Sequence, residues 1–156
     1  MTFILGKKPM HCFICKAVEE GVSKENLVLY VTEHSMVMLN RYPYISGHLM
    51  VVPHAHVSGL DNLSEEQMVD LHETLRKTIS AVRTALAPQG INVGMNLGKA
   101  AGAGVEDHIH WHVIPRFLGD NNAFNVLAEA RVIPESLEAT FERYLPVFRE
   151  LQAAAY

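Results

Sequence analysis

The most informative stretch of this sequence is HIHWHVI, residues 108–114. Successive side chains of a β-strand point to opposite faces, so a strand here places its first, third and fifth residues on one face. These three residues are all histidines: His108, His110 and His112. Each buried imidazole needs partners for two nitrogens, which makes three in alternation hard to explain by packing alone. The row therefore predicts a strand with an apolar face toward a core and a histidine face toward a functional pocket.

Two chemistries need such a row of imidazoles. The histidines can bind a catalytic metal, as strand-borne histidines do in some zinc enzymes. Alternatively, one histidine is a nucleophile that attacks phosphorus while its neighbours orient it, because a neutral imidazole is common at cell pH. The preceding loop GKAAGAG, residues 98–104, favours phosphate. Its small residues let backbone amides approach an anion closely.

Composition limits the class of protein. The chain has 156 residues, of which 49% are hydrophobic and 19% charged, so we expect one globular domain over residues 1–156. The formal net charge of −4 argues against a nucleic-acid polymer as partner. The sequence has no apolar run of membrane-spanning length, and residues 1–15 lack the features of a secretory signal. We therefore expect no membrane partner and a cytoplasmic location.

The order of predicted strands and helices along the rest of the sequence indicates an α+β fold. Short apolar runs indicate strands at 27–32, 36–40, 48–53, 91–97 and 108–114. A long helix is predicted after Ser64, because Ser64 and Gln67 form a capping box and apolar residues then recur every three or four positions. Pro88 and Gly90 end this helix. A C-terminal helix is expected to begin at Pro134 and to break or kink at Pro146.

Cys12 and Cys15 are the two cysteines of the chain, and their C-x-x-C spacing leaves two interpretations open. One is metal ligation, and the other is a redox pair.

The sequence resembles the histidine-triad (HIT) family of nucleotide hydrolases and transferases. The histidine row matches the family motif, and Asn40, Gly47-His48 and Val51-Val52-Pro53 resemble its nucleoside-binding strand pair. The resemblance covers a core of residues 12–116, followed by a C-terminal extension, 117–156. It implies an α+β fold with an antiparallel five-stranded sheet, a long helix and a C-terminal helix. Family members are typically homodimers in which two such sheets join into a ten-stranded one.

The resemblance also implies a catalytic and nucleotide-binding set. His110 would attack the α-phosphate to give a nucleotidyl-histidine, and His112 would contact the phosphate, with His108 completing the triad. Asn40 would hold the ribose, and Leu39 would pack near the base. Further phosphate contacts would come from Asn96, Gly102, Gly104 and His112.

A structural zinc ion is the cofactor that the resemblance implies. Many bacterial members bind zinc through an N-terminal C-x-x-C, a histidine soon after the V-V-P strand, and the first histidine of the triad. In this chain these residues are Cys12, Cys15, His56 and His108, a normal tetrahedral Cys2His2 set. His54 competes with His56 for the third position.

The segment after the triad, Pro115-Arg116-Phe117, and the long C-terminal extension resemble the branch that cleaves dinucleoside polyphosphates such as diadenosine tetraphosphate. Hydrolases of this branch often carry glutamine where this chain has Gly104, so hydrolysis and phosphate-dependent phosphorolysis both stay open. Three alternative hypotheses about function stay open: a purine nucleoside phosphoramidase, a nucleotide-binding sensor with low turnover, and a zinc hydrolase whose metal lies on the triad itself.

Overall fold

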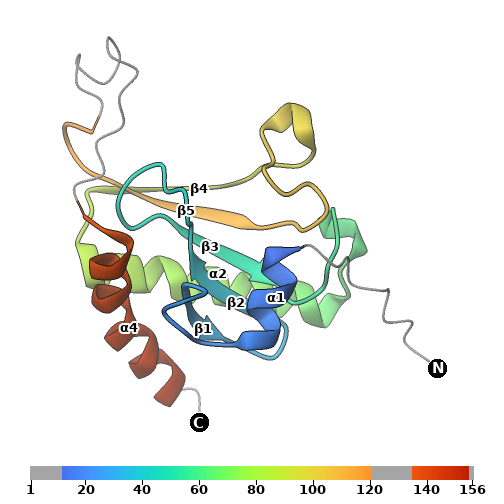
Figure 1. Ribbon diagram of the computed structural model, residues 1–156, viewed down its shortest axis with the longest axis horizontal. Coiled ribbons are helices and arrows are strands. Elements are labelled where there is room, and N and C mark those ends of the chain that lie inside the picture. The colour runs from blue at the N-terminus through green and yellow to red at the C-terminus, as the bar shows by residue number, and fades with distance from the viewer. Residues whose placement is uncertain (1–11, 121–134, 155–156) are drawn as a thin grey trace.

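The fold is built on one antiparallel sheet of five strands. The structure is a computed structural model that describes residues 12–120 and 135–154. The strands lie in the order β1-β2-β3-β5-β4, and each pairs antiparallel with its neighbour (Figure 1). The predicted α+β class with a five-stranded antiparallel sheet is therefore confirmed. The strands are β1 Val28–Val31, β2 Ser35–Leu39, β3 Leu49–Pro53, β4 Gly90–Met95 and β5 Trp111–Arg116.

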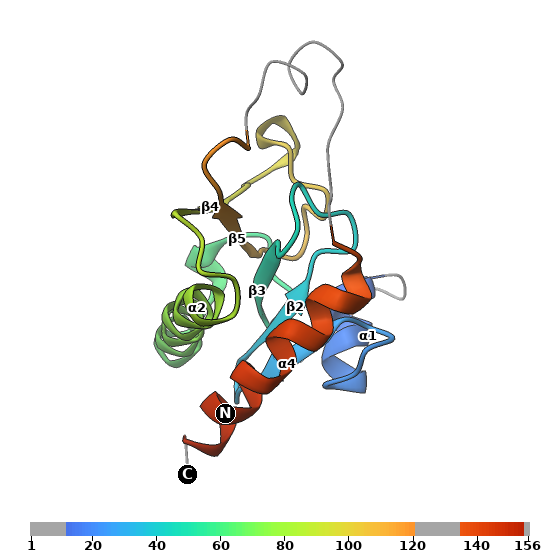
Figure 2. The same ribbon diagram turned by 90° about the vertical axis from the view of Figure 1, so that its left-hand side faces the viewer.

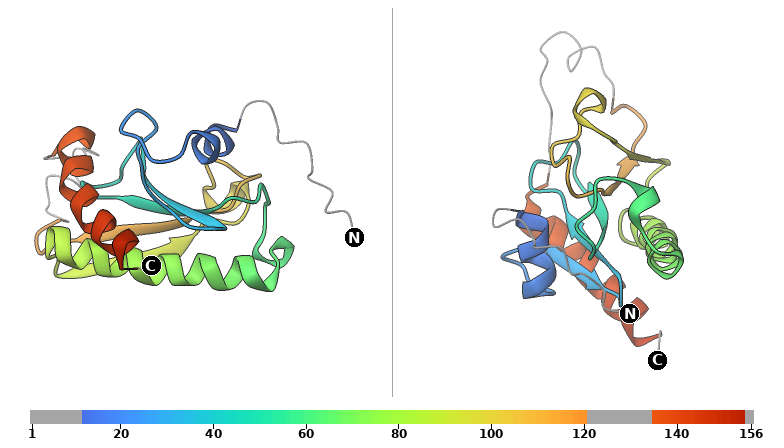
Figure 3. Two further views of the ribbon diagram at one scale, coloured as in Figure 1. Left: turned by 90° about the horizontal axis from the view of Figure 1, so that it is seen from below. Right: turned by 90° about the vertical axis from the view of Figure 1, so that its right-hand side faces the viewer.

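Helices cover both faces of the sheet. Helix α1 (Phe13–Glu20) lies on one face and α2 (Glu65–Leu86) on the other, as the view from below in Figure 3 shows. Helix α4 (Leu137–Ala153) follows the segment that the structure leaves undescribed. Two short 3-10 turns, η1 (Leu60–Asn62) and η2 (Lys99–Ala101), complete the described elements. Within the described residues, no helix is both long and apolar enough to cross a membrane.

Helix α2 begins as its sequence predicts. The Ser64 side chain accepts a hydrogen bond from the amide of Gln67 at 3.2 Å, and the Gln67 side chain accepts one from the amide of Ser64 at 3.0 Å. This capping box satisfies amides that the first helical turn leaves without partners. The helix ends at Leu86, where Ala87 adopts a left-handed conformation.

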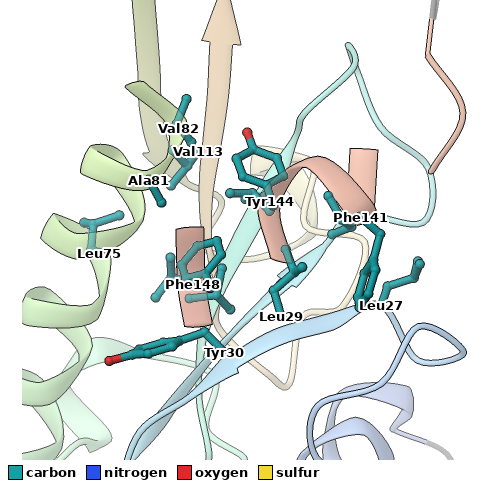
Figure 4. Packing of buried hydrophobic residues seen from close by; sticks show 14 of the residues in the cluster. Leu27, Leu29, Tyr30, Leu75, Ala81, Val82, Val113, Phe141, Tyr144 and Phe148 are labelled. Carbon is teal, nitrogen blue, oxygen red and sulfur yellow. The ribbon is translucent and has the colours of Figure 1, made fainter. Parts of the chain in front are cut away.

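The larger core lies between the sheet and helices α2 and α4. Figure 4 shows three aromatic side chains of α4 packed against this core: Phe141, Tyr144 and Phe148. The Tyr144 hydroxyl donates a hydrogen bond to the carbonyl of Gly47 at 2.9 Å. Gly47 has a φ of +84°, and a Cβ there would collide with the Leu86 side chain, so only glycine fits. Helix α4 therefore fixes the turn that leads into β3.

A smaller core lies on the opposite face, under α1. Ile14 and Ala17 of α1 pack against Met38 and Met50 of the sheet, together with three further buried residues: Val28, Met36 and Val52. Figure 2 shows α1 and α2 on opposite sides of the strands. Methionine side chains are flexible and fill irregular space. A cavity lies on this face of the sheet, lined in part by Met38 and Met50.

Two local expectations differ from the structure. The fifth strand begins at Trp111 rather than His108, because the amide of Ile109 bonds the carbonyl of Val57 at 2.8 Å outside the ladder. Helix α4 continues through Pro146, whose ring is exposed, so water can hydrate the carbonyl that loses its partner. The predicted start of this helix at Pro134 lies outside the described residues, and the observed cap of α4 is Ser136. Helix α1 was not predicted.

Candidate active site and metal centre

A cavity of about 710 Å³ lies on the α1 face of the sheet. Its floor includes Met38 and Met50, and α1 forms one wall with Phe13 and Lys16. His110 and His112 lie in the lining, as does Asn40. Cavities of this volume are of the size that holds a small-molecule ligand. Two of the three triad histidines thus share one cavity with an apolar floor.

The His110 side chain is held in a defined tautomer. It is 6% exposed, and its Nδ1 lies 2.9 Å from the carbonyl oxygen of His108. A carbonyl only accepts hydrogen bonds, so Nδ1 must carry the hydrogen. In the neutral ring the lone pair then resides on Nε2. A ring nitrogen with a lone pair is the group that a nucleophilic imidazole requires.

His112 is oriented by a chain of two hydrogen bonds. The amide of Tyr44 donates to Nδ1 of His48 at 3.2 Å, so the His48 hydrogen is on Nε2. Nε2 of His48 lies 2.9 Å from Nδ1 of His112 and donates to it. Nε2 of His112 therefore carries a hydrogen that it can donate to a ligand. The geometry gives the two cavity histidines opposite roles: a lone pair on His110 and a donor on His112.

Burial keeps these donors neutral. Desolvation, and secondarily the neighbouring imidazole of His112, lowers the pKa of His48 to about 3. Desolvation, and secondarily His110, lowers the pKa of His112 to about 4. Both rings are thus uncharged near neutral pH, as the hydrogen-bond chain requires.

The lowered pKa of His48 predicts a loss of stability in acid. The folded state has a pKa of about 3 and the unfolded state about 6.5, so below pH 6.5 the unfolded chain binds the proton first. We expect the free energy of unfolding to fall by up to about 1.4 kcal/mol per pH unit for this group. In urea unfolding at pH 7 to 5, His48→Gln should lose less stability on acidification than the wild type. If the unfolding free energies of the two proteins fell equally between pH 7 and pH 5, the lowered pKa of His48 would be contradicted.

The predicted nucleotide-binding residues fall into two groups. Asn40, Gly102, Gly104 and His112 line the cavity. Asn96 does not lie in the lining. Its side chain donates to the carbonyl of Gly102 at 3.4 Å and so braces the loop.

The structure places Leu39 elsewhere. Leu39 is 1% exposed and belongs to the larger core on the opposite face. Because side chains alternate along β2, it is Met38 that faces the cavity. Met38 and the α1 wall were not predicted, although alternation along a strand from Asn40 puts Met38, not Leu39, on the same face.

The side chain of His108 does not line the cavity. It is one of four metal-ligating side chains that lie close together. Cys12, Cys15, His56 and His108 have their ligand atoms within 4.8 Å of one another, and we call them the metal cluster. Nδ1 of His108 lies 3.5 Å from Sγ of Cys12, 3.6 Å from Sγ of Cys15 and 3.2 Å from Nδ1 of His56. Nε2 of His108 bonds the carbonyl of Pro53 at 2.8 Å, which directs Nδ1 to the cluster.

These separations fit a tetrahedral zinc shell. Zn–N bonds of about 2.0–2.1 Å and Zn–S bonds of about 2.3 Å put two nitrogens about 3.3 Å apart and a nitrogen and a sulfur about 3.6 Å apart. The observed 3.2 Å between the two Nδ1 atoms, and 3.5 and 3.6 Å from Nδ1 of His108 to the two sulfurs, agree with this shell. Sγ of Cys15 lies somewhat closer to Nδ1 of His56, at 3.3 Å. The donor set favours a metal site over a redox pair.

The metal cluster contains His56 and not His54. Strand β3 ends at Pro53, so the alternation that would put both histidines on one face does not continue. His54 lies away from the cluster, and its buried Nε2 has no hydrogen-bond partner among the described residues.

Comparisons with known proteins establish the family of this chain. A model of the HIT domain matches residues 22–119, so the chain belongs to the HIT family. It is 39% identical over 117 residues to a Mycobacterium tuberculosis (strain H37Rv) protein named AP-4-A phosphorylase, covering 75% of this chain and 60% of that protein. The bis(5'-adenosyl)-triphosphatase of Dictyostelium discoideum is 29% identical over 133 residues, 81% of this chain and 89% of that protein.

A solved structure shares the fold. It is a Zn-bound histidine triad family protein from Mycobacterium smegmatis, 28% identical, with a TM-score of 0.73 over 93% of this chain and 98% of that one. The chain spans only 60% of the length of the M. tuberculosis relative.

Proposed function

We propose that this chain cleaves dinucleoside polyphosphates at the α-phosphate through a nucleotidyl group carried on His110. The observation that carries the proposal is the bond from His110 Nδ1 to the carbonyl of His108, which leaves Nε2 with a lone pair in the cavity wall. The names of the M. tuberculosis and D. discoideum relatives support the substrate class.

The reaction proceeds in two displacements. Nε2 of His110 attacks the α-phosphorus, a P–N bond forms, and the P–O bond to the departing nucleoside polyphosphate breaks with its electron pair. The Nε2 hydrogen of His112 stabilises the charge on the phosphoryl oxygens. Water or inorganic phosphate then attacks the same phosphorus and releases His110. Gly102 and Gly104 leave room beside the phosphates.

Zinc is the metal that we propose for the metal cluster, held by Cys12, Cys15, His56 and His108. A bound ion there would supply structural cross-linking between distant segments. His110 and His112 are not members of the cluster. This separation disfavours a zinc hydrolase with its metal on the triad.

Phosphorolysis is the favoured second displacement. The M. tuberculosis relative is named a phosphorylase, and a Cβ on Gly104 would meet no atom within 4 Å. The space where hydrolases of this branch often place glutamine is therefore open here. An open space in the cavity lining can admit a phosphate ion as acceptor.

Product analysis tests the function directly. The protein is incubated with diadenosine tetraphosphate, with and without inorganic phosphate, and the nucleotides are separated by anion exchange. We expect ADP and ATP only when phosphate is present. AMP and ATP regardless of phosphate would show a hydrolase. No cleavage in either condition would overturn the substrate class, leaving phosphoramidates and a sensor role to be tested.

Asn40 is proposed to hold the ribose. Its Oδ1 accepts from the amide of Tyr42 at 2.9 Å, which directs the amide nitrogen as the donor available to a ribose oxygen. We expect Asn40→Ala to raise KM about tenfold, the loss of one hydrogen bond. With a 2',3'-dideoxy substrate the variant and the wild type should have the same KM. Asn62→Ala, at an exposed position in η1, is the matched control.

We also propose a homodimer joined at β4 into a ten-stranded sheet. β4 is an edge strand, Asn92, Val93 and Gly94 are exposed, and Val93 is 39% exposed. Unpaired amides and carbonyls of an edge seek partners. The opposite edge, β1, is packed against α4 and is less accessible.

A charge on this edge should disrupt the dimer. We expect Val93→Asp to give a monomer by light scattering, since a carboxylate would lose its hydration in the joined sheet. Val22→Asp, at a position 51% exposed outside the sheet, should leave the mass unchanged. A wild-type protein that is already monomeric would contradict the proposed assembly.

The single domain over residues 1–156 and the cytoplasmic location stay predictions.

A further inference from the structure

The metal cluster and the cavity share two structural elements. Helix α1 carries Cys12 at its cap and Cys15 in its first turn, and both belong to the cluster. The adjacent face of the same helix carries Phe13, Lys16 and Ala17, all of which line the cavity. One eight-residue helix therefore forms both a cluster wall and a cavity wall.

The second shared element is His108. Its side chain belongs to the cluster, and its carbonyl oxygen holds Nδ1 of His110. The amide of the next residue, Ile109, bonds the carbonyl of Val57, one residue after the cluster ligand His56. A movement of the cluster residues thus moves the support of His110 as well.

Apolar contacts alone give α1 a small anchor. Ile14 and Ala17 are its two buried contacts with the smaller core, at 0% and 3% exposure, while Phe13 is 49% exposed. The cysteine pair is a further anchor at this end of α1. Without a metal, weak hydrogen bonds link the sulfurs to the imidazoles in place of metal–ligand bonds of defined length.

We propose that zinc binding at the metal cluster and nucleotide binding in the cavity are cooperative, because the cluster anchors both the α1 wall and the support of His110. This inference rests on the proposed function. Two ligands that each order the same elements raise one another's affinity, and the factor must be equal in both directions. We expect a factor of about five or more, within the usual range of such coupling.

Zinc competition measures the coupling without relying on turnover. The zinc-loaded protein is titrated with a chromogenic chelator at increasing concentrations of AMP, and the zinc affinity is obtained at each. The affinity should rise about fivefold or more and then reach a plateau. Calorimetry should show AMP binding weaker by the same factor in zinc-depleted protein.

Two outcomes would overturn the coupling. One is an unchanged zinc affinity while calorimetry shows that AMP binds. The other is an affinity that rises with AMP without a plateau, since this means that zinc loss unfolds the whole domain and AMP only opposes unfolding. No AMP binding to the zinc-loaded protein would instead overturn the proposed function.

Two matched cavity variants test whether α1 is the element that couples the metal cluster to the cavity. Phe13→Ala removes a contact made by α1, whereas Asn40→Ala removes one made by the sheet side of the cavity. Both should weaken AMP binding. Only Phe13→Ala should lower the plateau of zinc affinity, and Asn40→Ala should reach the wild-type plateau at higher AMP. Equal plateaus in both variants would exclude α1 as the connection.

Discussion

Replacing His110 with alanine is expected to lower the rate of dinucleoside polyphosphate cleavage by about 10⁴-fold or more, the usual cost of losing a nucleophile. The variant lacks the Nε2 lone pair that attacks phosphorus, and no neighbouring group can take its place. His112 has its Nδ1 occupied by His48 and its Nε2 protonated, so it is a donor in this tautomer. Steady-state rates with diadenosine tetraphosphate, measured by anion-exchange chromatography, give the comparison.

Binding and surface controls separate chemistry from folding. AMP should still bind His110→Ala with an affinity within about tenfold of wild type, because ribose and base contacts persist. His72→Ala makes the same substitution on the exposed surface of α2 and should keep full activity. A His110→Ala protein that retains more than a tenth of the wild-type rate would show that another group is the nucleophile.

Replacing Cys15 with serine is expected to cost about 4 kcal/mol of unfolding free energy, the contribution of an ion present at a thousand times its Kd. For a domain of this size the midpoint of thermal unfolding should fall by about 8–16 °C. The cause is the loss of cross-links among the segments that carry Cys12, Cys15, His56 and His108. Differential scanning fluorimetry of zinc-loaded protein measures the shift.

A chelator provides the internal control for this variant. Treating the wild type with a strong chelator should lower its midpoint to near that of Cys15→Ser, and the chelator should leave the variant unchanged. A wild-type midpoint that does not respond to the chelator, with no zinc found by elemental analysis, would show that the cluster is not a metal site.

Much of this site could be predicted because its signals are local. The alternation of His108, His110 and His112 directed attention to the correct segment, and the Ser64 capping box predicted the start of α2. The cluster of Cys12, Cys15, His56 and His108 followed from the family resemblance, and the structure brings these four residues together.

Other features depend on tertiary contacts and leave little trace in the sequence. Helix α1 is eight residues long, and its cap, Cys12, makes no side-chain capping bond, so no start signal was present. The bond from Ile109 to Val57 interrupts the fifth strand, which turns His108 away from the cavity.

The partnership of His48 with His112 spans 64 positions of the chain. It arises because β3 pairs with β5, with Met50 opposite His112, and no local pattern specifies that pairing.

Trapping the covalent intermediate tests the role of His110 without a kinetic assay. Wild-type protein is mixed briefly with diadenosine tetraphosphate without phosphate, quenched in alkali to preserve a P–N bond, digested with trypsin and analysed by mass spectrometry. We expect one nucleotidyl group on the peptide of residues 100–116, located on His110 and absent from His110→Ala. Product formation with no nucleotidyl-peptide, or with the group on another residue, would contradict the role of His110.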